Sequence, residues 1–339
     1  MFSISSFIFL IILSASIFLF ARNLKKIIRN IKLGKGGLVF SNTKQRWKNV
    51  LFIAFGQSKM FKKPIVAVLH FIVYLGFIII NIELLEIVLD GILGTHRILS
   101  FMGGVYNFII GSFEVLAFLV IAACVIFLIR RNLLSIKRFW NDEMVGWPRL
   151  DANLILIFEI LLMFAFLFMN AADVILQDRD PFHYPQVGSF PISQYIALYL
   201  HHFSTTSLIF LERFCWWFHI IGILGFLNYL VISKHLHILF AFPNTYYSNL
   251  NPKGQFTNMR SVTKEVKIML DPNNDPFNQP ANTTEIERFG AKDVYDLTWL
   301  QLLNAYSCTE CGRCTAECPA NITGKKLSPR KIMMDVRDR

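Results

Sequence analysis

Long apolar stretches separated by shorter polar ones are the dominant pattern along the chain. Five of these stretches have the length and composition of helices that cross a bilayer. They cover residues 2–21, 64–87, 105–129, 152–170 and 211–233. The pattern predicts an all-α membrane protein, a bundle of five transmembrane helices followed by a more polar C-terminal part.

Basic residues are distributed unevenly between the apolar stretches. Residues 22–63 carry twelve Lys or Arg and residues 130–151 carry five, whereas 87–104 and 173–205 carry one each. Because cytoplasmic loops of membrane proteins are enriched in Lys and Arg, this alternation predicts an amino end outside and a carboxyl end inside. The formal charge of +11 then reflects topology and anionic lipid headgroups rather than nucleic acid.

The first apolar stretch is predicted to stay in the protein as a helix. A signal peptide carries its positive charge before the apolar run, whereas here Arg22 and Lys25 come after it. The composition, 54% hydrophobic, is also too apolar for a soluble enzyme of 339 residues. We therefore expect a multi-pass protein of the inner (cytoplasmic) membrane.

Shorter elements are predicted in the polar parts. Residues Trp47–Phe55 and Tyr195–Phe203 suit helices lying at the membrane interface. Residues 243–290 are rich in Pro, Asn and Asp and suggest an irregular linker. The expected division is 1–242, a cytochrome b-like membrane domain, then this linker, then 291–339, a small ferredoxin-like iron–sulfur domain.

Two helices are predicted in the last domain. Thr298 and Gln301 fit a capping box that starts the first, and apolar residues on one face follow at Leu297, Leu300 and Leu303. Ser328 followed by Pro329 fits the N-cap and first position of the second, predicted over Lys331–Val336.

The cysteines form one compact motif between these helices, Cys308-Thr-Glu-Cys-Gly-Arg-Cys-Thr-Ala-Glu-Cys318-Pro. This C-x2-C-x2-C-x3-C-P spacing is that of bacterial-type ferredoxin modules, whose thiolates hold a [4Fe–4S] cluster. A structural zinc site and a disulfide framework are the alternatives, but zinc sites favour separated C-x2-C pairs or histidines. We predict a [4Fe–4S] cluster on the reducing, cytoplasmic side. Its ligands are Cys308, Cys311, Cys314 and Cys318.

Histidines in the apolar stretches are candidate ligands of b-type haem, because polar groups in a bilayer are costly and often functional. The candidates are His70, His219 and His237. His219 and His237 lie eighteen residues apart, so on one continuous helix they would face the same way about 27 Å apart. The alternative for a histidine near a helix end is an interfacial anchor or a hydrogen-bonded core residue. We expect that role for His201, His202 and His235.

Four further residues in the apolar stretches are two glutamates, with two interpretations each, and two cysteines. Glu114 and Glu159 are candidates for a proton path to a quinone, although a helix–helix hydrogen bond is the simpler expectation. Cys124 and Cys215 lie outside the motif and are expected to be small buried residues.

Two parts of the chain resemble known families. The five-helix layout, with His219 and with Ser233-Lys234 before His237, resembles the nitrate reductase gamma subunit, a dihaem cytochrome b. Phe289-Gly-Ala, the residues around Thr298 and the cysteine motif resemble heterodisulfide-reductase-type iron–sulfur proteins. The combination is similar to membrane oxidoreductases that pass electrons between electron-transfer flavoprotein and menaquinone. The resemblance implies one or two haems b, a quinone substrate and a flavoprotein partner.

The chain departs from these families in two ways. The gamma subunit carries two ligand histidines ten residues apart on its second helix, whereas Ile80 stands ten residues after His70. We therefore expect His70 to pair with His237 toward the cytoplasm, and His219 to pair with His96 or a loop histidine. Relatives of the second kind continue into a second cysteine motif, so we expect the chain to be the first half of a larger cluster domain. Cys318 then either completes one cluster or serves a second one.

The predicted function is electron transfer between a cytoplasmic redox partner, such as electron-transfer flavoprotein, and the menaquinone pool. Basic residues beside the cysteine motif are candidates for docking an acidic partner. They are Lys325, Lys326, Arg330 and Lys331. The alternatives are a heterodisulfide-reductase-like or hydroxy-acid oxidase-type iron–sulfur subunit, and a membrane anchor without catalysis.

Overall fold

The computed structural model describes residues 4–38, 40–134, 136–252, 254–255, 258–272 and 289–339. These residues are helical, and their only β-type pairing is one isolated bridge between Lys35 and Thr298. Within them, five helices are long and apolar enough to cross a membrane. They are α1 (Ile4–Ile31), α3 (Pro64–Leu93), α4 (Gly104–Asn132), α5 (Trp147–Arg179) and α7 (Thr205–Leu230). The all-α prediction and the five predicted spans are confirmed at this level.

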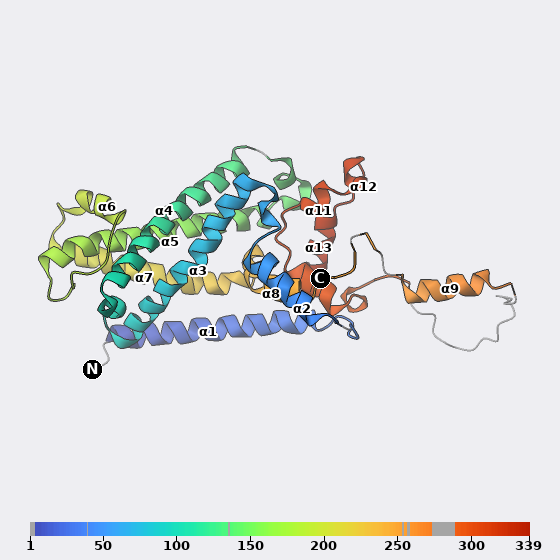
Figure 1. The fold of residues 1–339 in the computed structure, drawn as a ribbon, viewed down its shortest axis with the longest axis horizontal. Coiled ribbons are helices and arrows are strands. Elements are labelled where there is room, and N and C mark those ends of the chain that lie inside the picture. Colours follow the sequence, from blue (N-terminus) through green and yellow to red (C-terminus); the bar gives the residue numbers. More distant parts are fainter. Residues whose placement is uncertain (1–3, 39, 135, 253, 256–257, 273–288) are drawn as a thin grey trace.

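The shorter helices are gathered mainly at one end of the bundle (Figure 1). They are α2 (Thr43–Asn49), α6 (Ser193–Leu200), α8 (His237–Tyr246), α9 (Arg260–Leu270), α10 (Trp299–Tyr306), α11 (Arg313–Ala316), α12 (Pro319–Ile322) and α13 (Pro329–Asp338). The predicted interfacial helices correspond to α2 with the π-helical stretch Val50–Phe55, and to α6.

The two ends of the bundle differ in what they carry (Figure 1). The start of α1 and helix α6 lie at one end, which we call the far end. Helices α8, α10, α11, α12 and α13 lie at the other, which we call the cysteine end because the cysteine motif is there. An odd number of crossings puts the first helix's start and the motif at opposite ends, as the sequence predicts.

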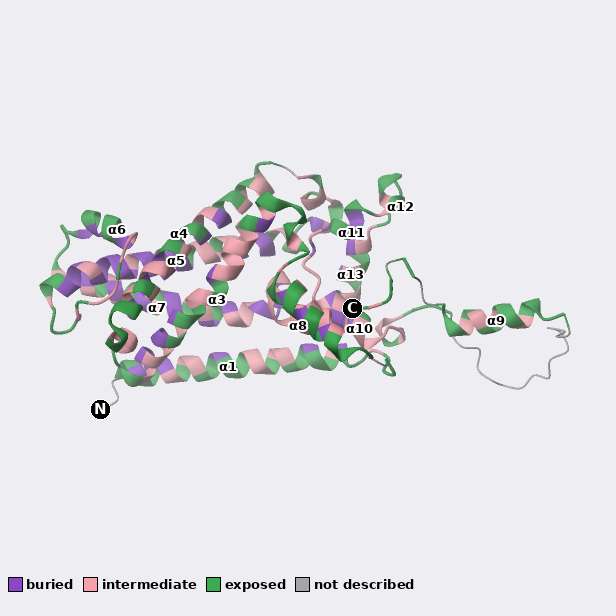
Figure 2. Cartoon of the chain, viewed as in Figure 1, coloured by how far each residue is buried: buried purple, intermediate pink, exposed green. Residues whose placement is uncertain are grey.

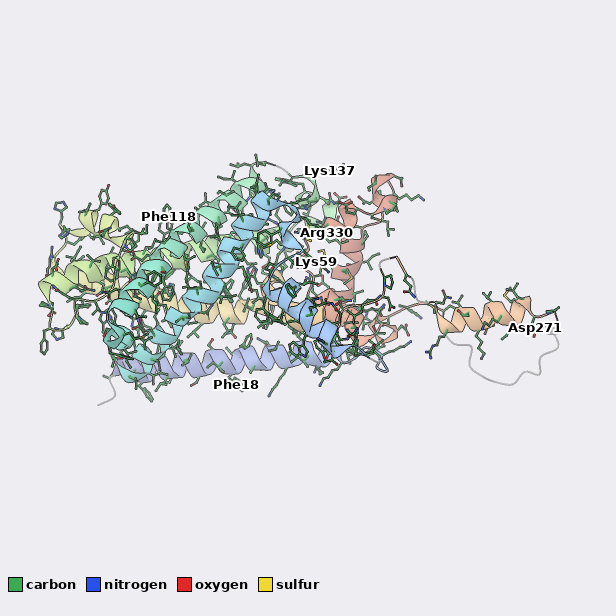
Figure 3. The ribbon with its side chains drawn as sticks, viewed as in Figure 1. Phe18, Lys59, Phe118, Lys137, Asp271 and Arg330 are labelled. Atoms are coloured by element: carbon green, nitrogen blue, oxygen red, sulfur yellow. The ribbon has the colours of Figure 1, made fainter. Side chains whose placement is uncertain are left out.

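Helix α5 occupies the middle of the bundle and packs against α4, α6 and α7. Figure 2 shows its buried residues as a nearly continuous band, and Phe166 in that band is fully buried. Apolar side chains on the perimeter are instead exposed, among them Phe18 at 66% and Phe118 at 52% (Figure 3). An apolar core inside an apolar perimeter is the arrangement expected when lipid, not water, surrounds the helices.

Helix α1 continues ten residues beyond the predicted end at residue 21, through the basic residues, to Ile31. Ile27 and Ile31 are buried there against Val231 and Leu303 of the cysteine end. This packing stabilises the last turns of α1, which the sequence pattern predicted to end before the basic residues. The helix therefore connects the membrane bundle to the C-terminal domain.

The C-terminal domain docks on the turn that follows α1. The backbone N–H of Lys35 donates to Leu297 O at 2.7 Å, and Trp299 N–H donates to Lys35 O at 3.2 Å. Gly34 permits this approach, because a Cβ atom there would lie 2.4 Å from Trp299 N. Helix α10 then starts with the predicted capping box, in which Thr298 and Gln301 satisfy each other's backbone N–H groups.

The fifth spanning helix carries His219 but not His237, contrary to the expectation that both lie on one continuous helix. Helix α7 ends at Leu230, a short 3₁₀ turn covers Lys234–Leu236, and His237 starts the separate helix α8. Ser233 is extended, with φ −107° and ψ 164°. The eighteen-residue spacing of His219 and His237 therefore does not give them the same facing, since no single helix carries both.

The predicted irregular linker is partly helical. Helix α8 runs through Pro243 to Tyr246, and α9 forms a separate amphipathic helix. Residues 273–288 of this predicted linker lie outside the described residues. At the other end of the domain, Ser328 and Pro329 cap and start α13 as predicted.

Candidate functional site

The cysteine motif is a compact loop between α10 and α12. Cys308 follows α10, Cys314 lies in α11, and Cys318 immediately precedes α12. Two residues between them are in the left-handed region, Glu310 with φ +53° and Gly312 with φ +70°. Glycine adopts that conformation without strain, whereas glutamate does so only where its surroundings hold it.

Three of the cysteines lie close enough to influence one another. Burial raises the pKa of the Cys308 thiol, and Cys311 and Cys314 raise it further. Since thiolates are the ligand form, binding metal here has to outweigh the burial that favours the protonated thiol. Arg138, from the loop before α5, lies near Cys311 and supplies compensating positive charge.

No three His, Cys, Asp or Glu side chains among the described residues converge on one metal-ion position. A single tetrahedral zinc ion requires such convergence. A [4Fe–4S] cluster has a different requirement, because each cysteine binds a different iron and the sulfurs surround the cube.

Glu310, inside the motif, joins the motif to the membrane bundle. Its carboxylate accepts from Lys234 Nζ at 2.8 Å and from an Arg337 guanidinium nitrogen at 2.8 Å. Burial raises its pKa, but the two cations outweigh burial and lower the pKa below its usual value. Lys234 also donates through its backbone N–H to Asp151 at the start of α5, at 3.0 Å. One buried ion pair thus connects the cysteine loop, the turn after α7 and helix α5.

Arg330 fixes the other side of the loop (Figure 3). Its side chain is fully buried and donates to Glu143 Oε1 at 2.7 Å and to Arg138 O at 2.7 Å. The Arg330 guanidinium also lies close to Gly312, because a Cβ atom added to that glycine would be 2.5 Å from it. The prediction that Arg330 docks a partner is wrong, because the side chain has no exposed surface.

Three histidines gather beside this loop at the cysteine end, and we call them the histidine group. His70 comes from α3, and His235 and His237 come from the turn and helix after α7. The His235 and His237 rings lie 5.6 Å apart, and His70 interacts electrostatically with both. Arg313 of the cysteine motif also acts on His70. The pairing of His70 with His237 as haem ligands stays a prediction.

His235 and His237 are held neutral, and His237 is also oriented. Burial, and then His237 and His70, lower the pKa of His235 to about 3, and burial also lowers the pKa of His237. His237 Nδ1 lies 2.9 Å from Lys234 O, which leaves Nε2 available. His70 Nδ1 is buried without a hydrogen-bond partner. Neutral imidazoles with a free ring nitrogen are the form that ligates haem iron.

His219 stands apart from this group, in a pocket between α3, α4, α5 and α7 that we call the central pocket. Its Nδ1 lies 3.0 Å from Leu162 O. The lining is largely apolar, includes Ile80, and contains no second histidine. His96 lies instead in another pocket, 3.3 Å from Asp173. The structure does not bring His96 and His219 together in one pocket.

A buried polar network at the far end was missed by the sequence prediction, and we call it the Arg97 network. Arg97 donates to Asp173 Oδ2 at 2.7 Å, to Tyr106 Oη at 3.0 Å and to Asn170 Oδ1 at 2.9 Å. Tyr106 in turn donates to Glu86 Oε2 at 3.0 Å. Acidic residues spaced three and four apart on α3 were the available signal. They are Glu83, Glu86 and Asp90.

The remaining predicted residues have mainly structural positions. Glu114 accepts from Asn170 Nδ2 at 3.0 Å and from the backbone N–H of Ser193 at 3.0 Å, so the hydrogen-bond interpretation is confirmed. Cys124 and Cys215 are buried, as expected. His201 and His202 are exposed beyond α6.

Two known proteins match most of the chain. The probable iron–sulfur-binding oxidoreductase FadF of Bacillus subtilis (strain 168) is 29% identical over 334 residues, which are 98% of this chain and 43% of that protein. The EtfAB:quinone oxidoreductase of Syntrophomonas wolfei is 27% identical over 292 residues, 84% of this chain and 36% of that protein. This chain is related to iron–sulfur oxidoreductases. It spans less than half the length of either relative.

A third relative adds a membrane connection. The probable membrane-anchored ferredoxin of Chromohalobacter salexigens is 45% identical over 47 residues, 14% of this chain and 7% of that protein. With the five candidate spans, it supports a multi-pass membrane protein. No protein-family model matches the chain, and no solved structure matches it significantly. The likeness to the nitrate reductase gamma subunit rests on layout and histidines alone.

Proposed function

We propose that the chain relays electrons across a membrane interface between a cytoplasmic redox partner, such as electron-transfer flavoprotein, and the menaquinone pool. The names of two relatives support this, since one is an iron–sulfur-binding oxidoreductase and the other an EtfAB:quinone oxidoreductase. The basic segments that alternate along the chain support a cytoplasmic position for the cysteine end.

Cys308, Cys311, Cys314 and Cys318 hold a [4Fe–4S] cluster, and His70 with His237 holds one haem b. Both groups supply one-electron redox chemistry when bound. The chain's own contribution is to place the two ligand sets side by side. Arg138 lies near Cys311 and balances the negative charge of a thiolate, and burial lowers the pKa of His237, which favours its neutral imidazole.

The observation that carries this proposal is the Lys234–Glu310 ion pair, at 2.8 Å. Glu310 lies between the first two cysteines of the motif, and Lys234 presents the carbonyl that orients His237. A single contact thus fixes the cysteine loop against the histidine group. Electron transfer by tunnelling requires that the cluster and the haem keep a fixed separation. A simple membrane anchor has no such requirement.

The test is to measure cofactor content in the purified full chain. The proposal predicts one haem b and four irons of a [4Fe–4S] cluster per chain, with an EPR signal after dithionite reduction. Replacing Cys311 with Ser should remove the EPR signal while the haem absorbance remains. A preparation grown with sufficient iron that contained no haem would overturn the haem assignment, and one without acid-labile sulfide would overturn the cluster.

A further inference from the structure

The central pocket lies between the two polar ends of the bundle. On α3 it begins at Val73, one turn beyond His70, and ends at Ile87. Phe226, which lines it, packs against His235 at 5.7 Å between ring centroids. The pocket therefore extends from the histidine group toward the Arg97 network.

The shape and lining of the pocket suit an apolar ring carrying two oxygen atoms. The walls are mainly Val, Ile, Leu and Phe side chains, with polar groups only at His219, Glu83, Glu159 and Asn81. Phe77 and Asn81, at one edge, are exposed on the perimeter that faces lipid. A ligand dissolved in the bilayer can thus enter from the side.

Glu83 is the unusual group in this pocket. It is 4% exposed, and its Oε2 is buried without any hydrogen-bond partner. A buried carboxyl without a partner is costly and is retained mainly where it has a function. It differs in this from Glu86 and Glu114, which accept several hydrogen bonds each.

Glu83 also lines a second pocket, which leads toward the far end. That pocket includes Asp173, His96 and Arg97. His96 contacts Asp173 at 3.3 Å and its side chain is 22% exposed. Titratable groups therefore extend from Glu83 through Asp173 to an imidazole that reaches the surface. The charged groups that act electrostatically on Glu83 are Arg97, Glu86 and Glu114.

We propose that the central pocket binds the headgroup of a quinone and that Glu83 exchanges protons between that headgroup and the far end. The inference rests on the proposed function, which supplies the electrons. Converting a quinone to a quinol takes two electrons and two protons. The electrons come one at a time from the histidine-group side. Each proton passes from the Glu83 carboxyl to a quinone oxygen, and Glu83 is reprotonated through the second pocket, whose lining includes the partly exposed His96. Quinol oxidation reverses these steps.

The first test measures quinone binding without electron transfer. The fluorescent quinone-site inhibitor 2-heptyl-4-hydroxyquinoline N-oxide is titrated into the full chain in lipid nanodiscs. We expect its fluorescence to be quenched at one molecule per chain, and Ile80→Trp, which fills the pocket, to abolish the quenching. Unchanged quenching in Ile80→Trp overturns the pocket assignment, whether or not the protein contains haem.

The second test measures proton exchange. Dithionite-reduced protein in nanodiscs is mixed with menaquinone, and reoxidation of the haem is followed. We expect Glu83→Gln to slow this step about a hundredfold, the lower range for loss of a proton-transfer group. Glu83→Asp should restore part of the rate. Asp180→Asn removes a carboxyl that pairs with His183 and lies outside both pockets, and it should retain the wild-type rate.

The two failures are distinguishable. If the wild-type chain has no haem, the proposed function fails, and the inhibitor titration still decides the pocket. If haem and dithionite reduction are normal in Glu83→Gln and reoxidation by menaquinone is as fast as in wild type, the role of Glu83 is overturned. Reoxidation in Glu83→Asp that is as slow as in Glu83→Gln, with a normal haem spectrum, would also overturn it. Aspartate has a shorter side chain but still carries a proton, so it should restore part of the rate.

Discussion

Glu310 illustrates how a residue between two proposed cluster ligands can fix the position of the loop that carries them. Its left-handed backbone turns the loop after Cys308, and its side chain is 3% exposed between Lys234 and Arg337. A buried ion pair contributes little net stability relative to apolar residues, but removing one partner leaves an uncompensated charge. The pair is therefore best understood as fixing the loop's position on the membrane bundle.

Replacing Lys234 with Met leaves Glu310 with Arg337 as its remaining cation. The change should destabilise the docked C-terminal domain, by less than the roughly 3–5 kcal/mol that an uncompensated buried charge costs. Limited proteolysis of the C-terminal domain in nanodiscs measures this as faster cleavage between α8 and α10. Lys331→Met removes an exposed cation that pairs with Asp335 within α13 and is the matched control. Equal cleavage rates in the two variants would contradict the account.

Replacing His70 with Ala should abolish the haem absorbance and leave the cluster's EPR signal intact, because the two ligand sets share no residue. Optical and EPR spectra of the same preparation measure both. His202→Ala, at an exposed histidine beyond α6, should change neither. Full haem content in His70→Ala would exclude this histidine as a ligand.

At the scale of elements, regular features were predictable and docking was not. The five spans follow from apolar length, and the starts of α10 and α13 follow from Thr298, Gln301 and Ser328. The extension of α1 was not predictable, because Ile31 is stabilised by residues more than two hundred positions away. Long-range packing of that kind leaves no local pattern in one sequence.

The site was predictable to a similar degree. The cysteine motif was recognisable from its spacing, whereas the pairing of His70 with His237 was expected from the resemblance to the nitrate reductase gamma subunit and stays a prediction. The end of α7 at Leu230 was not predictable from the sequence, because the turn is held by Asp151 of another helix, which accepts from the Lys234 N–H. Glu83 escaped notice because a carboxyl near the end of an apolar run resembles a boundary residue until its burial is known.

Gly34→Val should detach α10 from the end of α1, because its Cβ would lie 2.4 Å from Trp299 N and 2.6 Å from Thr298 C. Hydrogen exchange of the Lys35 and Trp299 amides, which bond across this contact, is expected to accelerate. Gly36→Val provides the control, since nothing lies within 4 Å of its added Cβ. Protected amides in Gly34→Val would show that the backbone contact is not needed.

At the scale of the whole molecule, the two ends of the bundle carry different polar groups. The cysteine loop and the histidine group lie at one end, and the Arg97 network lies at the other. The central pocket lies between them, with His219 and Glu83 in its walls. Electrons and protons can thus approach one site from opposite directions.

Acid should loosen the C-terminal domain through Glu143. Burial raises its pKa, but Ser328 and Arg330 outweigh burial and hold the pKa below its usual value of 4.5. Because the folded state has the lower pKa, its stabilisation is complete above about 4.5 and is lost as the pH falls through the folded value. Hydrogen exchange of α13 between pH 6 and pH 3.5 measures this. In Glu143→Gln, hydrogen exchange of α13 should depend less on pH than in wild type, because the titrating carboxyl is gone. An identical pH dependence in both proteins would contradict this role of Glu143.

Reoxidation of the reduced protein by menaquinone tests the central claim most directly. The full chain in nanodiscs is reduced with dithionite, menaquinone is added, and rapid-freeze EPR follows the cluster while absorbance follows the haem. The account predicts that menaquinone reoxidises both centres in wild type, and that His70→Ala leaves the cluster reduced. Cluster reoxidation in His70→Ala as fast as in wild type would contradict a relay from the cysteine motif through the histidine group to quinone.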